Sequence, residues 1–162
     1  MRIKTESTEV YKFEELDDAA QDKAIEQIGQ FQCEYDWWDS TYEDAERIGL
    51  TITSFDCDRA QKIEGKLNEN APIVAEKIIS EHGKDCSTFA LAESLLRQFH
   101  IDNVTSEQED ENEELEKEFE RALLEEYLSI LTKEYDYLNS REAIIETINA
   151  NEYEFTEDGR IA

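Results

Sequence analysis

The most constraining feature of the sequence is a run of twenty residues, 107–126, that holds eleven acidic side chains and only two basic ones. Apolar residues recur inside this run at spacings of three and four, Leu115 and Phe119 among them. Such spacing places the apolar side chains on one face of an α-helix and the carboxylates on the others. We therefore predict a long amphipathic helix, which begins near a capping signature formed by Ser106 and Glu109.

The net charge of the whole chain is negative as well. Of its 162 residues, 42 are acidic and 16 are basic, so the formal net charge is -26. Seven Tyr, seven Phe and two Trp still supply apolar surface for a core, unlike the composition of a disordered acidic tail. We expect one folded domain over residues 1–162. Repulsion among so many negative charges lowers stability, and a basic partner would relieve this repulsion. The alternative explanation of the charge is adaptation to a salty environment or a generally acidic proteome.

The local patterns predict an α+β fold, with a small, mainly antiparallel sheet packed against about six helices that include the long acidic one. Alternation and β-branched residues predict a strand at 50–58. Further strands are predicted at 8–13, 62–67 and 153–155, and the strands at 50–58 and 62–67 are expected to form a hairpin. Helical spacing predicts helices at 18–29, 35–48, 72–82, 87–99 and 140–150, with Asp18 as the N-cap of the first.

The N-terminal residues contain no apolar run and are not expected to form a signal peptide, and no stretch approaches the ~20 apolar residues of a membrane helix. Cys33, Cys57 and Cys86 are odd in number and show no C-x-x-C spacing, which favours free thiols in a reducing compartment. His82 lies four residues before Cys86, but a zinc site needs four ligands. We expect no metal, no cofactor and no membrane association.

Four residues of the predicted hairpin offer the one catalytic alternative. Asp56 and Asp58 share a face of the first strand, and Glu64 with Lys66 forms a Glu-x-Lys on the second. Metal-dependent nucleases hold Mg²⁺ with such carboxylates and support a water with the Lys. A nuclease must bind a polyanion, however, and the field of this chain repels one.

Two adjacent tryptophans, Trp37 and Trp38, stand between Asp36 and Asp39. Neighbouring side chains on a helix point about 100° apart, so both rings are buried only if the helix is covered on two sides. Packing in the core is the usual use of such aromatics. The alternative is that Trp37, flanked by Asp36 and Asp39, anchors a protein partner.

The carboxylate face of the long helix carries the leading functional hypothesis. Helical neighbours at spacings of three and four lie about 5–6 Å apart at Cβ, which is comparable with successive phosphates on a nucleic-acid strand. Direct binding of nucleic acid is not expected, because phosphate contacts need clustered Lys and Arg. We predict a surface that imitates nucleic acid toward a basic protein, or, as the alternative, a merely solvated helix face. The predicted contact surface on this helix consists of Glu107, Asp110, Glu111, Glu114, Glu118 and Glu125.

The chain also resembles a family of acidic proteins encoded by bacteriophages and prophages, some of which are labelled antitoxin-like. The resemblance spans nearly the whole chain and rests on the segments 11–16, 24–26, 37–38, 42–45, 48–50, 55–59 and 150–156.

The resemblance implies a phage accessory protein in the cytoplasm of the bacterial host. It brings no catalytic residue with it, and we expect no enzyme activity. Many small acidic phage proteins disarm host defence, and anti-CRISPR inhibitors are among them. The resemblance therefore suggests that this chain inhibits a basic, nucleic-acid-binding defence effector. The alternative is an antitoxin-like module that neutralises a basic toxin. A homodimer is compatible with either.

Overall fold

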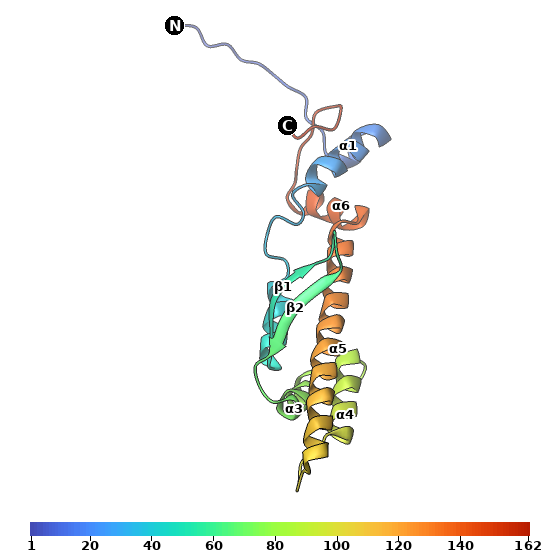
Figure 1. Ribbon diagram of the computed structural model, residues 1–162. Helices are drawn as coiled ribbons and strands as arrows, with labels where there is room; N and C mark the ends of the chain where they lie inside the picture. The colour runs from blue at the N-terminus through green and yellow to red at the C-terminus, as the bar shows by residue number, and fades with distance from the viewer. The chain divides into compact units, whose positions relative to one another are not determined.

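Six α-helices and one two-stranded antiparallel sheet make up the fold in the computed structural model, which describes residues 1–162 (Figure 1). This confirms the expected α+β fold, and the long acidic helix is α5. The elements in chain order are the 3₁₀-helix η1 (Phe13–Glu15), α1 (Asp18–Gly29), α2 (Asp39–Arg47), β1 (Leu50–Asp56), β2 (Lys62–Leu67), α3 (Ala71–Glu81), α4 (Ser87–Gln98), α5 (Ser106–Leu138) and α6 (Arg141–Ala150).

The elements group into two compact units. Residues 37–133 form one, which we call the central unit. Residues 1–36 together with 134–162 form the other, which we call the terminal unit. Each unit has a hydrophobic core of its own. The expectation that residues 1–162 behave as one domain stays a prediction.

The core of the central unit forms around the β1–β2 hairpin. The two strands pair antiparallel, with one irregularity of register after Ile52. The predicted alternation is confirmed at Leu50 and Ile52, which are both buried. Phe119, Leu123 and Tyr127 of α5 are buried in the same cluster, together with residues of α3 and α4. The apolar stripe of the acidic helix therefore packs on the core, which leaves its acidic faces to solvent.

The cap of α5 differs by one position from the prediction. The backbone N–H of Gln108 donates to Thr105 Oγ1 at 3.2 Å, and the N–H of Thr105 donates to Gln108 Oε1 at 3.0 Å. This reciprocal pair is a capping box, so Thr105 and Gln108 take the roles predicted for Ser106 and Glu109. Thr and Gln make the same two hydrogen bonds as Ser and Glu, and the sequence alone does not choose between adjacent candidates.

In the terminal unit, α1 packs against α6. Ala24 and Ile28 of α1 and Ile144 and Ile148 of α6 are buried in one cluster with Phe155. Small residues on α1 let the two helices approach closely, and burial of each large apolar side chain stabilises the unit by about 1.5–3 kcal/mol.

Both helices of this pair begin at a capping side chain. The Asp17 carboxylate accepts a hydrogen bond from the N–H of Ala20 at 2.8 Å, so the N-cap of α1 is Asp17 and not the predicted Asp18. The hydroxyl of Ser140 accepts from the N–H of Ala143 at 3.2 Å at the start of α6.

The strands predicted at 8–13 and 153–155 are wrong. Tyr11 and Phe155 exchange two backbone hydrogen bonds of 2.8 Å, but they form only an isolated bridge, and η1 follows at once. Residues 1–10 are exposed throughout. Residues 8–10 therefore bury no side chain that would support a longer strand pair, and a short isolated pair is marginal in water.

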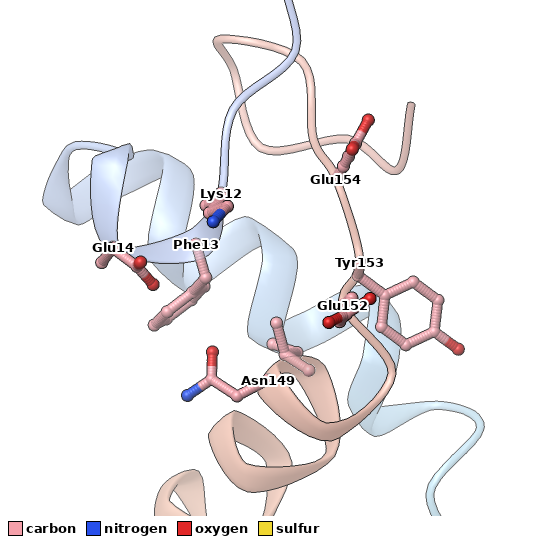
Figure 2. Close-up of a pocket in the computed structure, with 8 residues that line it drawn as sticks. Lys12, Phe13, Glu14, Asn149, Glu152, Tyr153 and Glu154 are labelled. Atoms are coloured by element: carbon pink, nitrogen blue, oxygen red, sulfur yellow. The ribbon is translucent and has the colours of Figure 1, made fainter.

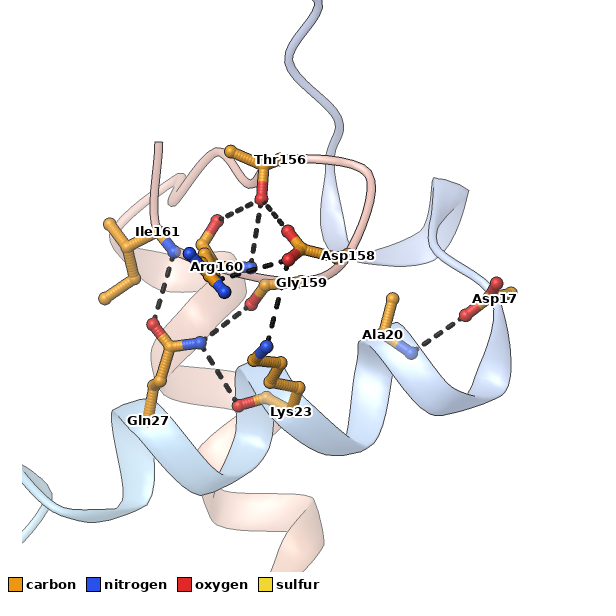
Figure 3. A network of polar contacts seen from close by, with 9 residues as sticks. All are labelled: Asp17, Ala20, Lys23, Gln27, Thr156, Asp158, Gly159, Arg160 and Ile161. Atoms are coloured by element: carbon orange, nitrogen blue, oxygen red, sulfur yellow. Dashed lines mark hydrogen bonds and ion pairs between the residues drawn. The ribbon is translucent and has the colours of Figure 1, made fainter.

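The C-terminal residues are tied to α1 by polar contacts (Figure 3). The Gln27 side chain donates to the Gly159 carbonyl at 3.0 Å and accepts from the N–H of Ile161 at 3.3 Å. Lys23 pairs with Asp158 at 3.8 Å. Gly159 is buried, with a left-handed φ of 90°, which an L-residue with a side chain rarely adopts. The contacts therefore hold a backbone segment whose close approach depends on glycine.

Candidate functional site

Five of the predicted carboxylates lie together in one depression on the central unit. Its volume is about 690 Å³, and α4 lies beside this part of α5 (Figure 1). The depression combines an acidic rim with one apolar and one amide side chain. It is lined by Glu107, Asp110, Glu111, Glu114 and Glu118 with Leu115 of α5 and Gln98 of α4.

The residues after α4 are fastened to α5 beside this depression. Asn112 donates from Nδ2 to the His100 carbonyl and accepts from the His100 N–H, both at 2.9 Å. The His100 Nε2 lies 2.7 Å from Glu111 Oε2. The other four carboxylates of the depression form no ion pair. These four exposed carboxylates therefore face solvent without an ion-pair partner.

The remaining predicted contact residues do not join the depression. Glu125 is exposed farther along α5, and Asp36 belongs to the terminal unit. Asp39 lines a separate depression of about 610 Å³ with Tyr42 and other residues of α2. The structure thus brings together the first five residues of the predicted surface, and the lining of the depression includes none of the others.

Trp37 is half-buried in an aromatic cluster. Its ring lies edge to face with Trp38 at 5.7 Å and with Phe55 of β1 at 5.6 Å between centroids, and Tyr42 meets Phe55 at 6.0 Å. Such pairs stabilise beyond their burial by about 0.5–1.5 kcal/mol. α2 begins only at Asp39, with Trp38 as its N-cap, so the helix predicted from residue 35 starts four residues late and both tryptophans lie before its first turn.

Two carboxylates of the nuclease alternative, Asp56 and Glu64, hold the hairpin together. Asp56 Oδ1 accepts hydrogen bonds from the N–H groups of Asp58 at 2.9 Å and Arg59 at 3.1 Å. These bonds favour the ionised form and hold the pKa of Asp56 below its ordinary value. Glu64 accepts from the hydroxyl of Ser54 at 3.3 Å. No group of three His, Cys, Asp or Glu side chains in the structure has the arrangement to hold a metal ion.

A partly buried polar network, which sequence reasoning missed, joins α2, α4 and α5. The Tyr127 hydroxyl donates to Asp44 Oδ2 at 2.8 Å, and His82 Nε2 lies 3.1 Å from the same oxygen. His82 Nδ1 lies 2.6 Å from the Thr88 hydroxyl. Tyr127 lies on the predicted apolar stripe, but nothing in the sequence pairs it with Asp44, 83 positions away.

The order Thr88, His82, Asp44 is that of a nucleophile, a base and an orienting acid. A depression of about 420 Å³ adjoins them and also contains Cys86. Thr88, however, is only 4% exposed, so little of its side chain faces this depression. The network is therefore suited to fastening three helices together.

Tyr127 gives the network a testable dependence on pH. Burial first, and then the hydrogen bond to the Asp44 carboxylate, raise the pKa of Tyr127 far above its ordinary value. The unfolded chain ionises this phenol near pH 10, and the folded chain keeps it neutral. Stability from this group is therefore complete below pH 10 and falls above it.

We expect the free energy of unfolding to fall more steeply above about pH 10 in the native chain than in Tyr127→Phe, by up to about 1.4 kcal/mol per pH unit. Urea denaturation followed by circular dichroism between about pH 8 and 12 measures the difference. Parallel slopes for the two proteins would mean that Tyr127 ionises without unfolding.

The terminal unit has a depression of its own, with a volume of about 450 Å³ (Figure 2). Figure 2 shows Lys12 and Glu14 on one side and Glu152, Tyr153 and Glu154 on the segment after α6. Phe13, Ile148 and Asn149 complete the lining. Three carboxylates and one ammonium leave this surface acidic, like the depression beside α5.

Searches of protein-family models, curated proteins and solved structures find no match to this chain. The resemblance to acidic phage proteins stays a prediction. None of the helices combines the length and the apolar composition that crossing a membrane requires. The α+β fold and the acidic depression are thus the basis for a functional interpretation.

Proposed function

We propose that this protein is a non-enzymatic inhibitor that binds a basic, nucleic-acid-binding defence protein in the bacterial cytoplasm. The observation that carries the proposal is the depression beside α5, where five carboxylates gather and four of them lack an ion pair. The row of carboxylates from Glu107 to Glu118, which we call the acidic stripe, would occupy the groove in which the partner normally holds a phosphate backbone. Phage origin, as the sequence resemblance implies, fits this activity.

The helix supports the proposal through its regularity. The rise of 1.5 Å per residue spreads the stripe from Glu107 to Glu118 over about 16 Å. The capping box and the buried apolar residues of α5 hold the backbone of this row of charges in place before binding, so little backbone freedom is lost on association. Charge complementarity of this kind accelerates association and weakens with added salt.

The test is capture of the partner from bacterial lysate on the immobilised protein. We expect a basic nucleic-acid-binding protein to be retained at low salt and released by high salt or by competing duplex DNA. The triple variant Glu111→Lys, Glu114→Lys, Glu118→Lys should weaken this binding by about 100-fold, because attraction becomes repulsion at the contact.

The matched control reverses three charges on the opposite side of the same helix, at Glu109, Glu113 and Glu120. This variant changes the net charge equally but leaves the depression intact. If both triple variants lost the same amount of binding, the overall charge and not the depression would explain the loss. Capture of a small basic toxin that does not bind nucleic acid would favour the antitoxin-like alternative. Mg²⁺-dependent cleavage of plasmid DNA that Glu64→Ala abolishes would contradict the non-enzymatic proposal.

A further inference from the structure

An apolar depression lies between α4 and α5, next to the acidic one. Its volume is about 180 Å³. Leu95 and Phe119 are 4% and 5% exposed and form its floor, and the half-buried Leu91 and Ala122 stand at its sides. Three residues, Gln98, Leu115 and Glu118, line both depressions. The two are therefore continuous, and the acidic stripe leads into an apolar socket.

The size of the socket suits one apolar side chain. A cavity of ~150 Å³ accommodates a molecule as large as benzene, so Leu, Met or Phe of a partner has room here. Phosphates and riboses offer no such group. The socket thus distinguishes a protein segment from the nucleic acid that the stripe imitates.

Charge complementarity identifies the occupant. The carboxylates at the rim, Glu107, Glu111, Glu114 and Glu118, repeat every three or four residues along α5. Lys and Arg at the same spacing on a partner helix lie on one face, opposite these carboxylates. A second copy of this chain, with its own net charge of -26, is repelled from the groove. An anionic membrane surface is repelled in the same way.

We propose that the groove between α4 and α5 binds a basic amphipathic helix of the partner, with one apolar side chain seated over Leu95 and Phe119. The inference rests on the proposed function for the acidic contact, and it adds the secondary structure of the partner segment and its anchor. Binding then has two components: a charge component that salt weakens, and an apolar component that salt leaves in place.

The test uses fluorescent synthetic peptides and the full-length protein. The first peptide is helical, with Lys at spacings of three and four and one Leu a turn beyond the last Lys. The second replaces this Leu by Ser, and the third has the composition of the first in scrambled order. Fluorescence anisotropy gives their affinities at low and high salt.

We expect the Leu peptide to bind about tenfold more tightly than the Ser peptide at both salt concentrations, since one buried aliphatic side chain contributes at least this factor. The scrambled peptide should bind more weakly than the Leu peptide. Filling the socket by Ala122→Phe should remove the preference for Leu and leave the salt-sensitive binding of both peptides.

Each contrary result points to one of the two claims. Equal affinities of the Leu, Ser and scrambled peptides would overturn the helix and its anchor, and would leave the charge-based function standing. A preference for Leu that survives Ala122→Phe, in a protein that melts like the native chain, would place the anchor elsewhere and overturn the inference. Unchanged binding of every peptide to the triple variant Glu111→Lys, Glu114→Lys, Glu118→Lys would overturn the proposed function itself.

Discussion

Replacement of Gly159 by Ala is expected to lower the stability of the terminal unit by about 3 kcal/mol, or to release the C-terminal residues from α1. A Cβ atom at this position would lie 2.1 Å from the carbonyl oxygen of Ala20. The φ of 90° adds strain for any residue with a side chain. Because the obstacle is the backbone of α1, no side-chain rotation relieves it. Release would uncover Phe155, which is fully buried.

Chemical denaturation measures the loss, and hydrogen exchange at the N–H of Tyr11 and Phe155, which pair with each other, measures the release. Gly83→Ala is the control. A Cβ there meets no atom within 4 Å, and the change should be neutral or stabilising by up to about 1 kcal/mol. If Gly159→Ala denatured and exchanged like the native chain, the C-terminal segment would not pack on α1 in the way seen in Figure 3.

Removal of the Asp44 carboxylate is expected to destabilise the central unit by about 3 kcal/mol. In Asp44→Ala the Tyr127 hydroxyl and His82 Nε2 lose the oxygen atom that both contact. Tyr127 is fully buried, and the Asp44 side chain, 36% exposed, is the group that accepts the hydrogen bond of its hydroxyl. An unsatisfied buried donor costs about 1–3 kcal/mol.

A double-mutant cycle with Tyr127→Phe separates the two contacts. Tyr127→Phe alone should cost about 1 kcal/mol, and in the Asp44→Ala background it should cost less or stabilise, because the orphaned hydroxyl is removed as well. Glu43→Ala, at an exposed neighbour on α2, should stay within about 0.5 kcal/mol of the native protein. Strict additivity of the two substitutions would show that Asp44 and Tyr127 do not interact.

Much of the fold could be predicted because helices and hairpins leave local traces. The apolar spacing within 107–126 predicted the first part of α5, and the strand predicted at 62–67 agrees with β2. The predictions were wrong where residues with a local preference for a strand or helix do not form the tertiary contacts that would stabilise it. Residues 8–13 favour a strand, but only Tyr11 forms a β-bridge. The helix expected from residue 35 starts at Asp39, because Trp37 and Trp38 turn toward Phe55 before α2 begins.

The candidate site was predictable in part for the same reason. Spacings of three and four identified the row from Glu107 to Glu118 as one side of a helix. They did not show that Glu125 lies outside the depression, or that Leu91 and Leu95 of α4 extend it into an apolar socket. Those facts depend on which helix packs beside α5.

The sequence by itself determined that residues 107–126 form an amphipathic helix with a dense negative charge, since periodicity decides which side chains of one helix share a face. Only the tertiary structure decided which of these charges gather in a depression and what lies beside them. It alone also brought Asp44 to His82 and Tyr127, across 38 and 83 positions. Contacts over such separations arise from helix packing, which no local pattern encodes.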